Sequence, residues 1–156
     1  MRRKLSPNWL KRILNVWPPF LGAGIKVLTI NENWDYAKVR LKKGLLNTNY
    51  FGTAYGGSLF SMTDPFYVLM LTNQLGRNYI VWDKGASIKY ISPGRSHVYC
   101  EFRLTKQQVD EIRRHADINE KYEPEFEVDI IDESGELVAK VFKKLHIKRK
   151  AKKTES

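Results

Sequence analysis

Residues 52–76 read GTAYGGSLFSMTDPFYVLMLTNQLG, and this stretch decides what the rest of the chain must build. Between Leu59 and Leu71 the apolar residues point to every side of a helix, and a helix that is apolar all round is a buried one. Gly76 follows the last apolar turn, where glycine commonly ends a helix. The stretch therefore predicts one long central helix over about residues 53–75, with the other elements packed around it.

The segments on both sides of this helix alternate apolar and polar residues, which is the pattern of strands with one buried face. The pattern is clearest where Val98, Cys100, Phe102 and Leu104 form the apolar set. A turn around Gly135 separates the last two strands. The whole chain is predicted to hold six strands: two within 22–43 and one each over 79–91, 97–104, 126–130 and 137–147.

Two shorter helices are predicted beside the central one. Ser6-Pro7 is a typical helix start, and Pro18-Pro19 ends that helix, which gives a basic amphipathic helix over about residues 7–17. A capping box over residues 105–108 opens the other short helix. We expect the N-terminal helix to pack on its own domain, and the alternative is that it lies on a membrane surface.

This order of elements favours an α+β fold, in which a curved antiparallel sheet of about six strands wraps around one long central helix. The 156 residues suit a single domain over 1–149 followed by a basic tail over 150–156. Cys100 is the single cysteine and the three histidines lack paired spacing, so neither a disulfide nor a metal site is expected. The absence of a transmembrane segment or a leader favours a cytoplasmic protein.

The formal net charge of +10 is concentrated at the two ends of the chain. The first twelve residues carry +5, the last nine carry +4, and residues 13–147 carry only +1. Nucleic-acid-binding proteins usually present a basic folded face, so we expect no nucleic acid as a partner. The ends are interpreted as solubilising, and the alternative is a peripheral protein that binds nucleic acid or an anionic membrane through them.

The start of the central helix offers a site for negative charge. Gly56 and Gly57 let another group approach the backbone closely. The free amide groups of a first helical turn can hold an anion or a developing oxyanion. The alternative is that the two glycines only permit the helix to pack tightly on the sheet.

Asp64 is the unusual residue of the central helix, because an isolated carboxylate costs free energy to bury. Desolvation would raise its pKa and make it a better general base. Alternatively, Asp64 is the N-cap of a second helical segment that begins at Pro65, since a residue before proline is pushed out of the helical region. The two roles are compatible if a kink exposes the carboxylate to a cleft.

Asp83 and Lys84 place two charges inside a predicted strand. Adjacent strand residues face opposite sides, so one of the two must point toward the helix. An inward charge is either functional or paired, and an ion pair across the sheet edge is the simpler interpretation.

Together these motifs resemble those of the hotdog-fold acyl-CoA thioesterases of the PaaI type. The resemblance rests on the run from Asn49 through Thr53-Ala54-Tyr55-Gly56-Gly57 to Asp64, and on Tyr90-Ile91-Ser92-Pro93 at a strand end. The run from Phe51 to Phe66, with Val81-Trp82-Asp83-Lys84, is similar to an uncharacterised bacterial branch of the same superfamily. The resemblance spans about residues 8–149 and implies the hotdog fold.

The resemblance also implies roles for individual residues. Asp64 would be the general base or nucleophile, the Gly56 amide would polarise the thioester carbonyl, and Asn49 would fix substrate or water. The implied site lies between two subunits, so a homodimer or a tetramer is expected. No cofactor is implied beyond the coenzyme A of the substrate. The remaining residues assigned to substrate binding are Tyr55, Gly57, Asp83 and Lys84, with Lys89 and Arg95 for the phosphates of coenzyme A.

Two positions depart from the family pattern. Tyr55 stands where the thioesterases have a histidine, and Pro65 interrupts a helix that is usually continuous. The function expected from the resemblance is hydrolysis of an acyl-CoA or acyl-carrier-protein thioester. The rival interpretations are a non-catalytic acyl-binding or assembly protein on the same fold and the basic peripheral binder described above.

Overall fold

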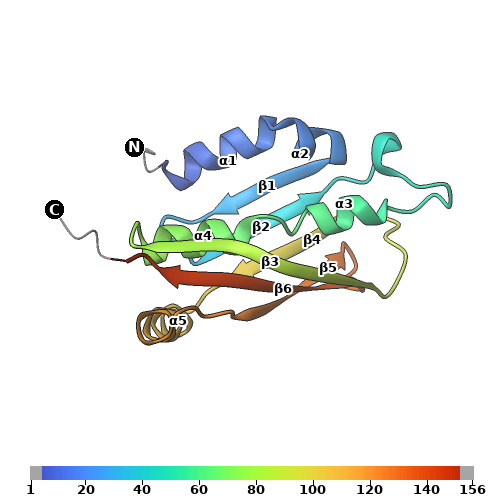
Figure 1. The fold of residues 1–156 in the computed structure, drawn as a ribbon. Helices are drawn as coiled ribbons and strands as arrows, with labels where there is room; N and C mark the ends of the chain where they lie inside the picture. Colours follow the sequence, from blue (N-terminus) through green and yellow to red (C-terminus); the bar gives the residue numbers. More distant parts are fainter. Residues whose placement is uncertain (1–4, 152–156) are drawn as a thin grey trace.

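The computed structural model describes residues 5–151, and its helices and strands are laid out in Figure 1. Six strands form one antiparallel sheet, and the central helical region lies along one face of it. The elements in chain order are α1 (Pro7–Val16), α2 (Pro18–Ala23), β1 (Ile25–Ile30), β2 (Tyr36–Leu41), the 3₁₀ turn η1 (Leu45–Asn47), α3 (Gly56–Ser61), α4 (Phe66–Leu75), β3 (Tyr79–Tyr90), β4 (Val98–Arg103), α5 (Lys106–Ile118), β5 (Glu125–Asp132) and β6 (Leu137–Arg149).

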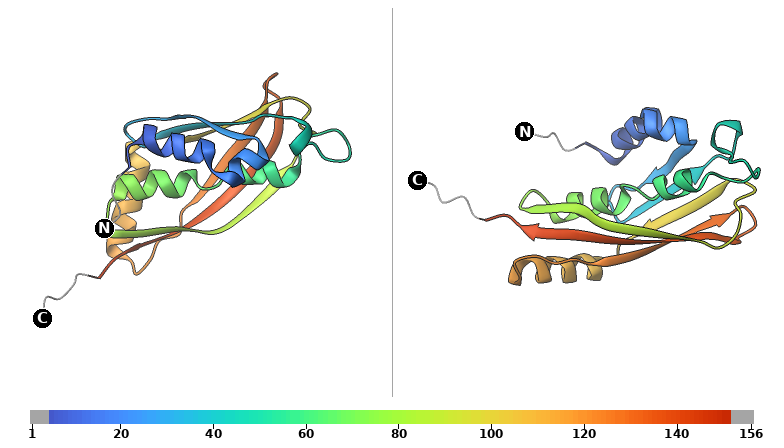
Figure 2. Two further views of the ribbon diagram at one scale, coloured as in Figure 1. Left: turned by 90° about the horizontal axis from the view of Figure 1, so that it is seen from above. Right: turned by 45° about the vertical axis from the view of Figure 1, so that its right-hand side comes forward.

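The strands are ordered β1-β2-β4-β5-β6-β3, and every neighbouring pair is antiparallel. The sheet curves around α3 and α4, and α5 lies at one end of the molecule below β6 (Figures 1 and 2). The predicted α+β architecture with a six-stranded sheet wrapped around a central helix is therefore confirmed. Its core is a single cluster that joins the buried rows of β1, β2, β4, β5 and β6 to α4, and half-buried residues of β3 pack against this cluster.

The central helix is divided into two segments where one continuous helix was predicted. Residues 62–65 interrupt it, because Pro65 has no backbone N–H to donate and restricts the residue before it. Asp64 N donates instead to Ser61 O at 3.2 Å, in a tight turn that ends α3. The Asp64–Pro65 peptide bond is cis. The N-cap position of α4 is Pro65 with no side-chain cap, so the interpretation of Asp64 as an N-cap is wrong.

The N-terminal segment also differs from its prediction. Ser6 caps α1 as expected, but the helix ends at Val16, and Pro18-Pro19 begins α2 in its first turn. The apolar residues of the predicted amphipathic helix lie on two faces, because Leu14 is buried whereas Trp9 is 52% exposed. The helix therefore packs on its own domain through one face and leaves apolar side chains on the other.

In the described part of the chain, one edge strand of the sheet, β1, is covered by a helix, and the other, β3, is not. Helix α1 runs along β1, and Asn15 reaches the free edge of that strand: its Oδ1 accepts from Val27 N at 2.7 Å, and its Nδ2 donates to Val27 O at 3.0 Å. Lys11 Nζ donates to Leu28 O beside it. Strand β3, at the opposite edge, is twelve residues long and has no strand or helix of the described chain along its outer side. An uncovered edge strand of this length is a place for pairing with another chain.

The C-terminal boundary lies later than predicted. Arg149 belongs to β6, and its guanidinium lies 3.1 Å from the carboxylate of Asp117. Lys150 N donates to Asn78 O at 2.8 Å, so the first residue assigned to the tail is bonded to the domain. Ala151 is the last described residue, and residues 152–156 of the predicted tail lie outside the described residues.

Removing the Asn15 side chain tests whether α1 protects the β1 edge. We expect Asn15→Ala to lower the free energy of unfolding by about 1–2 kcal/mol, because two backbone groups lose their partner. Asn8→Ala is the matched control, since Asn8 is on the same helix but makes one exposed hydrogen bond, to Glu32. Urea unfolding of both variants measures the difference. Equal effects would mean that the edge contacts add nothing to stability.

Candidate active site

The first carboxylate on the helix side of the sheet is Asp83, which lies immediately before a bulge in β3. The pairing of β3 with β6 shifts between Asp83 and Gly85, so Asp83 lies opposite Leu145 while Ala86 lies opposite Lys143. Leu145 belongs to the buried row of β6, and directly opposite residues in an antiparallel pair share a face. Asp83 is therefore the inward member of the Asp83-Lys84 pair, and its side chain is 28% exposed.

A buried lysine lies beneath this bulge and was missed in the sequence analysis. Lys143 occupies the inward row of β6, and its side chain is only 3% exposed. The signal was present in the sequence, because Lys143 has the same two-residue phase as Val141 and Leu145. A lysine is almost never fully buried unless it is paired.

Three charged groups meet where β3, β6 and the break in the central helix come together. Lys143 Nζ lies 3.1 Å from Asp83 Oδ1 and 3.8 Å from Asp64 Oδ1. Asp83 Oδ1 is shielded from solvent, so the lysine is the group that offsets its charge. The Asp64 side chain is 66% exposed in the single chain. The structure thus brings the predicted site residues Asp64 and Asp83 to the same lysine, Lys143.

The three groups border a cleft of about 280 Å³ between α3 and β3. This volume is near the lower end of the usual range for small-molecule sites. The cleft opens beside the uncovered β3 edge, so a second chain placed along that edge would extend its wall. Its lining residues are Gly57, Phe60, Ser61, Asp64, Asp83, Lys84, Gly85, Ala86 and Lys143.

The pKa of Asp64 is raised above its usual range. The main cause is desolvation, and the nearby negative charge of Asp83 adds to it, while Lys143 acts in the opposite direction. Water still reaches much of the side chain, which screens these interactions and limits the shift. A raised pKa makes Asp64 a stronger base than an ordinary aspartate once it is ionised.

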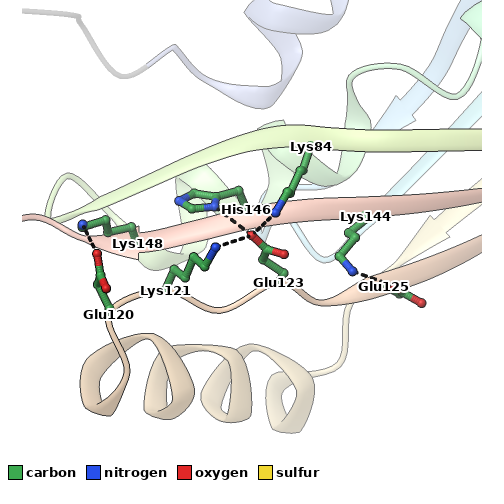
Figure 3. Close-up of polar contacts among 8 residues, drawn as sticks. All are labelled: Lys84, Glu120, Lys121, Glu123, Glu125, Lys144, His146 and Lys148. Carbon is green, nitrogen blue, oxygen red and sulfur yellow. Dashed lines mark hydrogen bonds and ion pairs between the residues drawn. The ribbon is translucent and has the colours of Figure 1, made fainter.

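Lys84 borders the cleft, but its amino group points away from it. On the other face of the sheet Lys84 Nζ lies 2.6 Å from Glu123 Oε1. Figure 3 shows the side chains of this pair. This hydrogen bond, with further contributions from His146 and Lys121, lowers the pKa of Glu123 to about 2. The amino group of Lys84 is therefore engaged in holding the segment before β5 against the sheet.

The two glycines at the start of α3 each face an aromatic ring. A Cβ at Gly56 would lie 2.9 Å from the Tyr90 hydroxyl, and a Cβ at Gly57 would lie 2.5 Å from the Tyr55 ring. The close-packing interpretation of the glycines thus holds, although the partners are side chains rather than the sheet backbone. Within residues 5–151 neither the Gly56 nor the Gly57 amide donates a backbone hydrogen bond, so both remain available to a ligand.

The other predicted site residues lie away from the acid–lysine cluster. Asn49 shapes its own loop: Oδ1 accepts from Phe51 N and Thr53 N, and Nδ2 donates to Thr53 Oγ1. Lys89 extends over the Phe142 ring on the outer face of the sheet, 5.3 Å from its centroid. Arg95 is exposed in the loop after β3. The substrate-binding roles of these three residues stay predictions.

Residues 8–147 match the model of a protein family described as "Domain of unknown function (DUF4442)". The chain belongs to the DUF4442 family. No curated protein matches it. Among the residues that the structure describes there is also no cluster of three or more histidine, cysteine, aspartate or glutamate side chains able to hold a metal ion, and no helix long and apolar enough to span a membrane.

Solved structures similar to this DUF4442 protein share its hotdog fold. PA5026 of Pseudomonas aeruginosa, described as a "Probable Thioesterase", matches with a TM-score of 0.81 and 19% identity, over 96% of this chain and 100% of that one. Thioesterase HI1161 of Haemophilus influenzae matches with a TM-score of 0.67 and 15% identity, over 98% and 97% of the two chains. The PaaI protein from the phenylacetic acid degradation operon of E. coli matches with a TM-score of 0.62 and 17% identity, over 95% and 97%. The predicted resemblance to PaaI-like hotdog proteins is confirmed at the level of the fold.

Asp83 and Lys143 are expected to have opposite effects on the pKa of Asp64. We expect Asp83→Asn to lower the pKa of Asp64, because it removes a nearby negative charge, and Lys143→Met to raise it, because it removes the compensating positive charge. Carbon-detected NMR titration of the Asp64 carboxyl group measures both. Asp129→Asn, which alters an exposed ion pair with Lys140, is the control and should leave Asp64 unchanged. Shifts in the same direction for both cluster variants would contradict the arrangement.

Proposed function

We propose that this DUF4442 protein is a thioesterase that hydrolyses an acyl-CoA or acyl-carrier-protein thioester. The observation that carries the proposal is the placement of Asp64 at the break of the central helix, beside a cleft and next to the Lys143–Asp83 pair. The hotdog fold shared with proteins described as thioesterases agrees with it. A cytoplasmic location remains part of the proposal.

In the proposed reaction Asp64 acts as the base. Lys143 offsets the charge of the shielded Asp83, which leaves Asp64 as the solvent-accessible carboxylate of the cluster. Asp64 takes a proton from water, and the resulting hydroxide adds to the thioester carbonyl carbon. The C–S bond then breaks, and the departing thiolate takes up the proton held by Asp64. Direct attack by Asp64 on the carbonyl carbon, followed by hydrolysis of the anhydride, uses the same geometry.

The proposal includes a second copy of the chain. Strand β3 leaves its outer edge uncovered, and the side of the central helices turned toward solvent keeps Phe60, Val68 and Leu69 only half-buried. Pairing of two β3 edges would cover these side chains and place the helices of both copies side by side. The free Gly56 amide of the partner would then polarise the carbonyl that Asp64 helps to attack.

A second candidate function is acyl binding without hydrolysis. The position of Tyr55 favours it, because its ring packs against Gly57 beside the cleft and replaces the histidine of the family pattern. Turnover of a panel of acyl-CoA esters separates the two functions: binding without release of free thiol would support the non-catalytic one.

Asp64→Asn tests the catalytic role of the carboxylate. We expect turnover to fall by roughly 10²–10⁴-fold, the range that general-base groups contribute, because the amide cannot accept the proton. The free energy of unfolding at neutral pH should stay equal or rise. When the pKa of a carboxyl group is higher in the folded than in the unfolded state, its ionisation destabilises the folded protein, and the amide removes this ionisation. Asp129→Asn, on the outer face, is the control for both assays. Full thioesterase activity in Asp64→Asn would end the catalytic assignment.

The pH profile of the wild-type protein gives an independent check. Asp64 is active as the ionised base, so kcat/KM should rise as pH increases through its raised pKa and level off above it. Asp83→Asn lowers that pKa and should move the rise to lower pH. An unmoved profile would mean that another group controls the reaction.

A shared site requires a dimer at working concentration. Sedimentation velocity at micromolar protein should therefore show a dimer, and a clean monomer would exclude the shared site. Gly56 is the first residue of α3, a position that accepts proline, so Gly56→Pro removes the amide hydrogen that alanine would keep. Mixing inactive Asp64→Asn and Gly56→Pro subunits should restore part of the activity, because a mixed dimer keeps one site with both wild-type groups. Absence of any recovery in mixed dimers would contradict the assignment of Gly56 to the partner's reaction.

A further inference from the structure

The first part of the folded chain is strongly basic, which the charge of the chain ends alone did not reveal. Residues 5–63 contain seven lysine and arginine residues but only two carboxylates, Glu32 and Asp35, both in the turn between β1 and β2. Residues 64–151, in contrast, contain fifteen basic and fourteen acidic residues. Positive charge therefore gathers on the folded part built from α1, α2, β1, β2 and η1.

A cleft in this region combines the positive charge with exposed leucines. It has a volume of about 480 Å³ and lies between α2, η1 and the first two strands. None of the described residues that line it is acidic. We call it the basic cleft and define it by Leu21, Lys26, Arg40, Lys42, Leu45 and Leu46.

The cations of the basic cleft have no acidic partner in the described chain. Lys26, Arg40 and Lys42 form no ion pair among residues 5–151, although many exposed lysines elsewhere do. Arg40 Nε is shielded from solvent and has no hydrogen-bond partner there. Lys26 and Arg40 lie opposite each other in the β1–β2 pair, so their side chains share one face. An anion at this face would supply the missing partner.

The three leucine side chains of the basic cleft are largely exposed to solvent. Leu45 is 99% exposed, Leu46 is 93% exposed and Leu21 is 58% exposed. The outward face of α1 also carries exposed apolar side chains, because Trp9 is 52% exposed and Val16 is 69% exposed. Large apolar side chains beside unpaired cations, with tryptophan among them, are typical of surfaces that lie in a membrane interface.

We propose that the α1–α2–η1 surface docks on an anionic lipid bilayer. Lipid phosphates would meet Lys26, Arg40 and Lys42, while Leu45 and Leu46 enter the acyl region. A nucleic acid would satisfy the cations but leave the leucines in water, and a second copy of this basic surface would be repelled by it. A bilayer rich in anionic lipid satisfies both components.

The test is co-sedimentation of the full chain with vesicles. We expect binding to vesicles of phosphatidylcholine and phosphatidylglycerol in equal amounts, weakening as salt is raised, and little binding to phosphatidylcholine alone. Each basic residue near such a surface contributes about fivefold in affinity, so Lys26→Gln/Lys42→Gln should weaken binding by about 25-fold. Leu45→Ser/Leu46→Ser should weaken it by at least about tenfold, because two exposed apolar side chains no longer insert.

Two controls match these variants. Lys144→Gln/Lys148→Gln removes the same charge from the outer face of β6. Figure 3 shows both of these lysines paired with glutamates. This variant should change vesicle binding less than about twofold for each charge removed. Ile118→Ser removes a side chain that is 69% exposed on α5 and should have no effect.

Four results would overturn the proposal. The first is absence of binding to the anionic vesicles at low salt, and the second is an equal loss of vesicle binding in the control and cleft variants. The third is binding of a DNA duplex that weakens in the lysine variant but not in the leucine variant. The fourth is loss of self-association in the leucine variant while its vesicle binding is unchanged. The last two would assign the surface to nucleic acid or to a second copy. None of them bears on the thioesterase assay, which reports on the Asp64 side of the molecule.

Discussion

A lysine held out of water organises the chemistry of this molecule. Burying an ammonium group is costly unless an opposite charge accompanies it, so Lys143 requires Asp83 on the neighbouring strand. Asp83 continues the inward phase of Tyr79 and Val81, immediately before the bulge in β3, and so faces Lys143. Once this pair is satisfied, a second carboxylate at the same spot experiences both desolvation and a nearby negative charge, and that is the position of Asp64. The site therefore depends on the costly burial of the Lys143 ammonium group and on the carboxylates that compensate its charge.

The position of Asp64 follows from a second constraint, which is the proline after it. Pro65 cannot donate to the preceding turn, so the central helix stops and restarts around it. The interruption leaves Asp64 in a tight turn, with its side chain free to reach the cleft and not committed to capping α4. In an unbroken helix, the carboxylate would be fixed by helical geometry. The same residue that departs from the family pattern thus shapes the candidate site.

The fold could be predicted from the sequence because its signals are local and periodic. Alternation gave the strands, and the all-round apolar run over 59–71 gave the central helix. Lys143 was equally predictable, because it stands in phase with the inward row of β6. The bulge at Asp83 could not be predicted, since it depends on how two strands settle against each other. The exposure of Leu45 and Leu46 also escaped prediction, because a loop has no period from which burial can be inferred.

One edge of the sheet is covered by described residues and the other is not, and this difference limits how many copies of the chain can join by strand pairing. Helix α1 lies along the β1 edge, where Asn15 and Lys11 bond to backbone groups of Val27 and Leu28, whereas no described element lies along the β3 edge. Two copies joined through β3 by a twofold axis would form one continuous sheet whose outer strands are both sealed. Such an assembly is closed after a single association step, and growth into a fibre by further strand addition has no template. The helix that lies along β1, with its Asn15 and Lys11 contacts, thereby favours a finite complex over an open-ended one.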